Sequence, residues 1–373
     1  MTARRVLLAL AGAAVALLVA EALLRALAIR PERCAPPRWL TWDGASYQDL
    51  GLWGNGRNKR TSPFVSDGVV MGEYVPGAKF KVVYASDPRG YFDADHSITF
   101  TINALGMRGP QTTRAKPAGQ FRVLGIGDSF TFGTGVHERD TYLSQLEQLL
   151  QAHDHSGRHA VLNAGVMGYN TRDEVLYLER RWLDLDPDLV LIGFYLNDAY
   201  DDVAFANMGE DLALTLEPTG LARASYVIDI LQHAWRAHAL KLALDQRYRS
   251  VYFQQPRRYL ERSDTDMDWL VARRSLEHAV ALAREHHFAI ALVLFPELRD
   301  LDGDYPFRAI HELVLDAAAQ IGLPALDLLA TFRGHPDREL WVHPSDHHPN
   351  EIAHRLAALQ IERFLRQHEL CGE

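Results

Sequence analysis

From Phe121 onward the chain alternates between short apolar runs and amphipathic segments. Five runs rich in Val, Ile and Leu occupy residues 122–126, 160–163, 189–194, 288–295 and 324–328. Their length and composition predict strands that are buried on both faces. Apolar residues at helical spacing fill the intervals, over residues 142–151, 172–182, 269–286, 307–321 and 351–366. Because parallel strands need a crossover, which is usually a helix, the pattern predicts a doubly wound α/β domain with a parallel sheet.

The region before this domain has a different pattern. Residues 79–84 and 97–102 largely alternate between apolar and polar side chains, which predicts half-buried strands. We therefore predict a linker and a small β-rich appendage over residues 31–119, followed by the α/β domain over residues 120–373. Residues 200–265 interrupt the alternation of strands and helices, and we interpret them as a helical insertion that forms a lid or cap.

The first 30 residues, 1–30, have a charged, apolar, charged pattern. Two arginines precede an apolar run that continues to Leu24, with Glu21 near its end. The run approaches the ~20 residues that a helix needs to cross a bilayer, and the preceding arginines favour a cytoplasmic amino terminus. We predict an uncleaved signal anchor in the inner membrane, with the rest of the chain periplasmic or otherwise extracytoplasmic. Residues 26–28 have the small-x-small form of a processing site, so cleavage stays an alternative.

Composition and charge disfavour several functions. The chain is 47% hydrophobic and 23% charged, which is typical of a globular protein. Its formal net charge of -9 disfavours nucleic acid as a partner, because a phosphate backbone attracts a cationic surface. The two cysteines, Cys34 and Cys371, are too few for a four-cysteine metal site. They form either one disulfide or two separate thiols.

Glycine-rich and polar segments follow the apolar runs, where the carboxyl ends of the strands are expected. Open parallel sheets bind ligands at that edge. Residues 127–133, Gly-Asp-Ser-Phe-Thr-Phe-Gly, place Ser129 in a glycine-flanked turn between a strand and a helix, as a nucleophile requires. Residues 163–171 and 193–198 contribute glycine and asparagine in the same way. Residues 343–350, His-Pro-Ser-Asp-His-His-Pro-Asn, directly precede the last helix.

Ser, Gly, Asn and His, delivered in this order by four separate elements, resemble the SGNH/GDSL hydrolase superfamily, in its membrane-anchored bacterial envelope form. The resemblance implies a flavodoxin-like parallel sheet and a serine esterase that works through an acyl-serine intermediate. Carried over by position, it makes Ser129 the nucleophile and His348 its general base. The N–H groups of Ser129 and Gly168 and the side-chain amide of Asn197 would form the oxyanion hole, and Gly165 is an alternative to Gly168.

One position departs from the commonest pattern of that superfamily. The orienting aspartate usually stands three residues before the histidine, where this chain has Ser345, whereas Asp346 stands two residues before it. Some anchored relatives and related O-acetyltransferases share the shorter spacing, so we predict a triad of Ser129, His348 and Asp346. A dyad without a carboxylate stays open.

Neighbouring polar residues have simpler interpretations. Asp128 and Asp198 are expected to hydrogen-bond local backbone rather than to transfer protons. The histidines around Asp346 have no second cluster of ligands beside them, so we expect neither a metal nor a cofactor.

The predicted activity is hydrolysis of an ester in an acylated small molecule or glycan. We expect O-acyl groups of a cell-envelope carbohydrate as substrate, an inference from the predicted location alone. Two alternatives stay open: an O-acetyltransferase of envelope polysaccharide that uses the same triad, and a catalytically silent carbohydrate-binding protein that keeps the fold.

Overall fold

A computed structural model describes most of the chain. The described residues are 3–30, 37–50, 63–65, 70, 72–154, 157–199, 218–248 and 267–372. The chain divides into two compact units, one of residues 1–36 with 204–251 and the other of residues 37–203 with 252–373. Cys34 lies outside the described residues, so one disulfide with Cys371 and two separate thiols both stay open.

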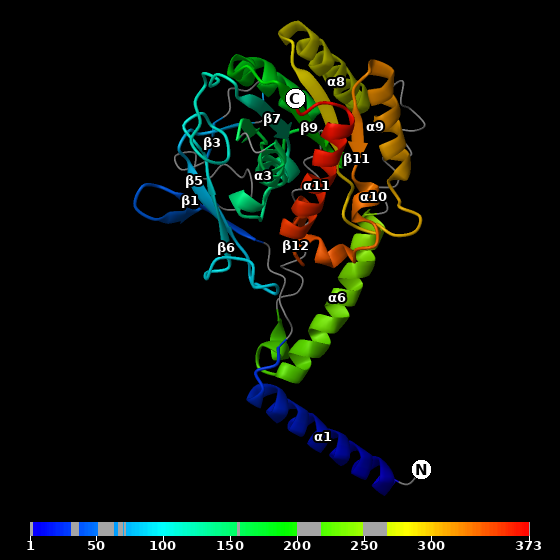
Figure 1. The fold of residues 1–373 in the computed structure, drawn as a ribbon. Helices are drawn as coiled ribbons and strands as arrows, with labels where there is room; N and C mark the ends of the chain where they lie inside the picture. Colours follow the sequence, from blue (N-terminus) through cyan, green and yellow to red (C-terminus); the bar gives the residue numbers. More distant parts are fainter. Residues whose placement is uncertain are drawn as a thin grey trace. The chain divides into compact units, whose positions relative to one another are not determined.

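The larger unit is built on a parallel sheet of five strands (Figure 1). The strands are β7 (Phe121–Gly127), β8 (His159–Asn163), β9 (Leu189–Phe194), β10 (Ala289–Leu294) and β11 (Ala325–Asp327). Their spatial order is β11-β10-β9-β7-β8, and all neighbours are parallel. Counted from β7, this is the flavodoxin-like order 2-1-3-4-5. All six residues of β9 are buried, as predicted for a strand covered on both faces.

Helices cover both faces of this sheet, which confirms the predicted doubly wound architecture. They are α2 (Ser129–Phe132), α3 (Tyr142–Asp154), α4 (Thr171–Tyr177), α8 (Met267–His286), α9 (Arg308–Ile321), α10 (Leu329–Phe332) and α11 (Glu351–Gln367). Short turns of helix lie between them: η1 (Glu138–Asp140), η2 (Leu178–Trp182), η3 (Leu183–Leu185), η4 (Leu196–Ala199) and η7 (Asp337–Glu339). Helix α3 packs against α11, whereas α8 packs against α4 and α9, so the helices form two layers.

A second, antiparallel sheet precedes β7 and forms the predicted β-rich appendage. Its order is β2 (Tyr47–Asp49), β1 (Arg38–Trp42), β5 (Lys79–Val83) and β6 (Ser97–Thr101), and a short ladder joins β3 (Phe64–Val65) to β4 (Glu73–Tyr74). Phe80 and Val82 of β5 are fully buried, whereas Lys79 is exposed, as the alternating pattern predicts. Both sheets lie in one compact unit, and the domain boundary near residue 120 stays a prediction.

Aromatic rings and one buried arginine join the appendage to the α/β sheet. The rings of Tyr74, Phe80 and Phe100 contact the ring of Phe132 in α2, with centroids 5.0, 6.1 and 5.2 Å away. Arg108, only 3% exposed, donates hydrogen bonds of 2.5 Å to the carbonyls of residues 132, 133 and 136. The sequence of the turn-rich segment 103–110 indicates only a connection between elements. In the structure, Arg108 of this segment binds the loop that follows Ser129.

A smaller unit contains the apolar helix α1 (Ala3–Ala26), the turn η5 (Gly220–Arg223) and α6 (Tyr226–Tyr248). One stretch of α1, Arg4–Ala26, is long and apolar enough to cross a bilayer, and its most apolar 18 residues have a mean hydropathy of 2.5. The carboxylate of Glu21 accepts hydrogen bonds from the N–H groups of Tyr226 and Val227, both at 3.0 Å. Glu21 therefore caps the first turn of α6. Helix α6 is the described part of the predicted helical insertion, and residues 200–217 and 249–266 lie outside the described part.

Arg108→Met should lower the free energy of unfolding by about 3 kcal/mol or more, because three buried carbonyls lose a charged donor. Chemical unfolding of the detergent-solubilised chain measures the change. Arg139→Met, at a position whose side chain is 71% exposed, is the matched control and should cost under about 0.5 kcal/mol. A similar small cost at both positions would contradict a clamp at Arg108.

Candidate active site

The nucleophile candidate, Ser129, begins α2 at the carboxyl end of β7, which lies between β9 and β8 in the sheet. Asp128 caps this short helix, because its Oδ1 accepts a hydrogen bond of 2.8 Å from the N–H of Phe130. This is the local backbone role expected for Asp128. The Ser129 side chain is partly exposed, so its hydroxyl is accessible at the edge of the sheet.

Three glycines leave room for the turn that carries Ser129. A Cβ on Gly127 or Gly193 would lie 2.0 or 2.1 Å from the Thr131 Oγ1, and one on Gly165 would lie 2.5 Å from the backbone nitrogen of residue 132. No side chain fits at such distances. Glycine is therefore required at the ends of β7 and β9 and just after β8 for α2 to pack against the sheet.

A chain of hydrogen bonds joins the three predicted triad residues. The Nε2 of His348 lies 2.9 Å from the Oγ of Ser129, and its Nδ1 lies 2.5 Å from the Oδ1 of Asp346. A nitrogen that faces a carboxylate oxygen must carry the proton, so Nδ1 is the protonated nitrogen and Nε2 presents its lone pair to the serine hydroxyl. Ser129 and His348 are 219 residues apart in sequence.

The hairpin of β12 (Trp341–His343) and β13 (Asp346–Pro349) explains the short spacing between the aspartate and the histidine. In an extended strand, residues two positions apart project from the same face. Asp346 and His348 therefore point the same way, whereas His347 projects from the other face and stacks on Trp341 at 4.0 Å. Ser345, at the position of the commoner spacing, instead bonds the Nδ1 of His343 at 2.7 Å.

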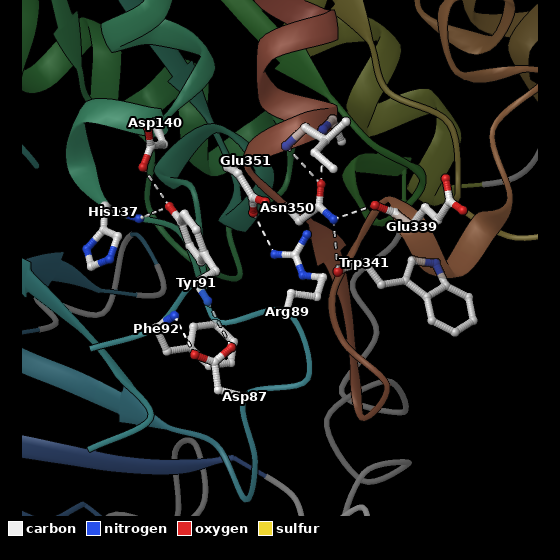
Figure 2. Close-up of polar contacts among 12 residues, drawn as sticks. Asp87, Arg89, Tyr91, Phe92, His137, Asp140, Glu339, Trp341, Asn350 and Glu351 are labelled. Atoms are coloured by element: carbon white, nitrogen blue, oxygen red, sulfur yellow. Dashed lines mark hydrogen bonds and ion pairs between the residues drawn. The ribbon is translucent and has the colours of Figure 1, made fainter. Parts of the chain in front are cut away.

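Asn350 fixes this hairpin to the start of α11 (Figure 2). Its Oδ1 accepts hydrogen bonds from the N–H groups of Ile352 and Ala353, which caps the helix. Its Nδ2 donates to the carbonyls of Glu339 and Trp341, at 2.6 and 3.1 Å. One buried side chain thus connects both ends of the segment that carries Asp346 and His348.

Burial and neighbouring charges shift the pKa values of Asp346 and of the histidines beside it. Burial alone would raise the pKa of Asp346, but the facing His348 and the hydrogen bonds that the carboxylate accepts from His348 and Tyr84 bring it down to about 2. Burial alone would lower the pKa of His348, but the charge of Asp346 outweighs it and the net pKa rises above its usual value. Asp346 is therefore an anion at neutral pH, and it favours proton uptake by His348. Burial lowers the pKa of His347 to about 4.

The structure distinguishes the two glycines considered for the oxyanion hole. The N–H of Gly165 donates to the Oδ1 of Asn163 at 3.0 Å, and Gly165 packs against α2. Gly168 is exposed and has a φ of 83°, and its N–H has no bonding partner among the residues that the structure describes. Asn197 lies in η4, directly after β9, and its side chain lies outside the described part.

The turn that carries Asn197, η4, contains Asp198, which lies beside a second buried carboxyl group, that of Glu174. Asp198 Oδ2 accepts a hydrogen bond from the N–H of Tyr195 at 2.5 Å, the local backbone role expected for it. Burial raises the pKa of Asp198 and of its buried neighbour Glu174 well above the usual range. These shifts favour a proton shared between the two carboxyl groups.

Two further contacts near the triad have no recognisable signal in the sequence. Tyr84, from the appendage, donates a hydrogen bond to Asp346 Oδ2 at 2.7 Å. Tyr195, whose ring stacks on Phe130 at 4.0 Å, donates to the buried carboxylate of Glu297. Both contacts join residues more than 100 positions apart, and neither Tyr84 nor Glu297 was a candidate site residue by sequence.

The five-stranded parallel sheet between two helical layers, with a serine turn at the carboxyl edge of an interior strand, defines a flavodoxin-like α/β fold. A family model, the GDSL-like lipase/acylhydrolase family, matches residues 126–356, more than half of the chain. The chain belongs to this family, and it is a hydrolase of ester bonds.

Solved structures also match part of this chain at low identity. A lipolytic protein of the G-D-S-L family from Desulfitobacterium hafniense is 16% identical, with 66% of this chain and 100% of that chain covered and a TM-score of 0.37. The acetyl xylan esterase AlAXEase is 16% identical over 65% and 98%, with a TM-score of 0.40. The Axe2 acetyl xylan esterase of Geobacillus stearothermophilus, in the form of a point variant, is 16% identical over 68% and 97%, with a TM-score of 0.41. No curated protein matches the chain.

Proposed function

We propose that Ser129, His348 and Asp346 form the catalytic triad of an esterase. The observation that supports this most strongly is the continuous chain of hydrogen bonds, 2.9 Å from Ser129 to His348 and 2.5 Å from His348 to Asp346. A neutral serine is a weak nucleophile, and an adjacent base with an oriented tautomer is what activates it. The site lies at the sheet edge where this class of fold binds ligands.

In the acylation step, Ser129 Oγ attacks the carbonyl carbon of the ester while its proton passes to His348 Nε2. The tetrahedral intermediate collapses when the bond to the alkoxide oxygen breaks, and His348 returns the proton to that oxygen. In the second step, water loses a proton to His348 and attacks the acyl-serine. The carboxylic acid leaves, and Ser129 recovers its proton. Asp346 stabilises the imidazolium that forms in each step and remains ionised throughout.

The oxyanion in each intermediate would accept hydrogen bonds from the N–H groups of Ser129 and Gly168 and from the side-chain amide of Asn197. Ser129 begins α2, where the N–H groups have no partner within the helix. Gly165 is a poor substitute for Gly168, because Asn163 already accepts its N–H. Each such donor typically contributes on the order of 3 kcal/mol to stabilising the transition state.

If the triad is correct, substitutions of Ser129 and Asp346 should impair activity, whereas a substitution of the adjacent Ser345 should not. Ser129→Ala should abolish turnover of an aryl acetate and labelling by a fluorophosphonate. Asp346→Asn should lower kcat by up to about four orders of magnitude, because the imidazole loses its orientation and the stabilisation of its charge. Ser345→Ala should be nearly silent, since Ser345 bonds His343 rather than His348.

All variants are measured with the same substrate, with His348→Ala as the reference for a lost base and circular dichroism as the control for folding. Labelling that survives in Ser129→Ala would place the nucleophile elsewhere. Equal, mild effects of Asp346→Asn and Ser345→Ala would remove the carboxylate from the triad.

We infer that the substrate is an O-acylated carbohydrate of the cell envelope, on the basis of the proposed anchor. The rival is an O-acetyltransferase, in which a sugar hydroxyl rather than water resolves the acyl-enzyme. Acetylated xylooligosaccharide is a practical first probe, with and without an unacetylated acceptor. Free acetate as the product with the acceptor present supports hydrolysis, whereas an acetylated acceptor supports transfer. A silent binding protein would yield neither product.

We also propose that α1 is a retained membrane anchor, with the remainder of the chain on the extracytoplasmic side. The contacts between Glu21 and the first turn of α6 support retention, because processing after Ala28 would remove this cap. Arg25 adds to the same cluster, with its guanidinium 5.3 Å from the ring centre of Tyr226. Arg4 and Arg5, before the apolar stretch, favour a cytoplasmic amino terminus.

A retained anchor predicts that the membrane fraction contains the intact chain of 42.0 kDa, as measured by mass spectrometry of the purified protein. A reporter that works only outside the cytoplasm should be active when it is fused after Glu373. A soluble product that begins after Ala28 would contradict retention, and a reporter active only in the cytoplasm would contradict the orientation.

A further inference from the structure

Tyr84 bonds the triad carboxylate from outside the hydrolase segment matched by the family model. It follows β5 directly, and its side chain is only 3% exposed. Its hydroxyl donates to Oδ2 of Asp346, whereas Oδ1 of the same carboxylate accepts from the Nδ1 and the backbone N–H of His348. Each carboxylate oxygen therefore has its own donors, and these fix the plane of the group.

The position of Tyr84 is itself well defined. Its backbone N–H donates to the carbonyl of His96 at 2.9 Å, which extends the pairing between β5 and β6 by one residue. Its ring stacks on Phe92, with a centroid distance of 4.5 Å and an angle of 11°. A Cβ on Gly135 would lie 2.7 Å from the Tyr84 hydroxyl, so the hydroxyl fills the space beside that glycine.

Residues 84–92, here called the strap, bind the α/β domain at three further places. Ser86 Oγ lies 3.1 Å from His343 Nε2, at the hairpin that carries Asp346 and His348. Arg89 forms an ion pair of 2.6 Å with Glu351 in the first turn of α11. The Tyr91 hydroxyl donates to Asp140 of η1 at 2.8 Å. Figure 2 shows the last two contacts, with Asn350 and the hairpin beside them.

A phenol suits this position because it donates at every working pH. Burial raises the pKa of Tyr84 well above its usual range, so the group stays neutral and keeps its proton. A buried carboxylate that lost this donor would keep one oxygen without a protein donor among the described residues, at a considerable cost in free energy. It would also be freer to rotate, and His348 would lose part of its orientation.

We propose that Tyr84 is a positioning residue of the active site, whose hydroxyl fixes the Asp346 carboxylate and, through it, the imidazole of His348. The inference rests on the proposed triad and adds a fourth member to it, supplied by the N-terminal sheet. The sheet is then part of the catalytic apparatus, although it does not touch the reacting atoms.

Tyr84→Phe in the full-length protein should lower kcat by about tenfold, because the variant loses a charge-assisted hydrogen bond but keeps the ring. KM for an aryl acetate should change less than about twofold, since the hydroxyl does not contact substrate. The acid limb of the kcat/KM profile should move to higher pH, because a carboxylate with one donor fewer attracts the His348 proton more strongly. The other carboxylates that act on His348, Asp128 and Glu297, are unchanged in this variant.

Tyr91→Phe is the matched control. It makes the same chemical change within the strap and removes the bonds of the hydroxyl to Asp140 and to the N–H of His137, both of which lie outside the triad. It should leave kcat and the acid limb as in the parent protein. Equal losses in both variants would mean that the strap has only a structural role, and this would overturn the proposal. A Tyr84→Phe variant with the parent kcat and pH profile would overturn it as well.

A double-mutant cycle shows whether Tyr84 acts through Asp346. In an Asp346→Asn background, Tyr84→Phe should lower kcat by less than about twofold, since the group it positions is already lost. An undiminished tenfold effect in that background would refute the route through the carboxylate.

The same cycle separates this proposal from the proposed function. If Asp346→Asn strongly lowers kcat and Tyr84→Phe leaves kcat unchanged, only the proposed role of Tyr84 is wrong. If Asp346→Asn keeps full turnover, the triad itself is wrong, and the role of Tyr84 is lost with it.

Discussion

The turn that carries Ser129 can pack against the sheet only where neighbouring strands have no side chains in its way. Gly127 is the last residue of β7 and Gly193 the last but one of the adjacent β9, and a Cβ on either would collide with Thr131. Gly165 leaves the same room beside the backbone of residue 132. This steric constraint sets the depth at which the serine turn lies. With the turn in this place, the Ser129 hydroxyl lies 2.9 Å from His348 Nε2.

The hairpin before the last helix solves the second geometric problem, which is to deliver two side chains to the same point from one short segment. An extended strand places residues two apart on one face, so a spacing of two suits Asp346 and His348 here. The intervening His347 then faces the other way, against Trp341. A carboxylate three positions before the histidine would need a different backbone path, and in this chain Ser345 at that position serves the turn of the hairpin instead.

The N-terminal sheet shares its core with the hydrolase sheet rather than standing apart from it. Phe132, three residues after Ser129, contacts rings from β4, β5 and β6. Arg108 binds the carbonyls that follow, and burial lowers its pKa only to about 10, so it stays charged at neutral pH. The loop after the serine turn is therefore stabilised from the appendage side, which is also the side that presents Tyr84 to Asp346.

The sequence by itself determined the α/β class, the five parallel strands and the identity of the residues at their carboxyl ends, because the apolar runs of such strands leave a strong local signal in hydrophobic pattern. It overstated the burial of the two edge strands, β8 and β11, most of whose residues are only half-buried. It also singled out Ser129, His348 and Asp346, since motif and order are properties of the chain. It did not distinguish the packing role of Gly165 from the exposed position of Gly168, and it did not reveal Tyr84. The roles of these three residues depend on which backbone segment lies against which strand, and on contacts between residues that are far apart along the chain. Contacts of that kind have no periodicity to read, so only the tertiary structure decides them.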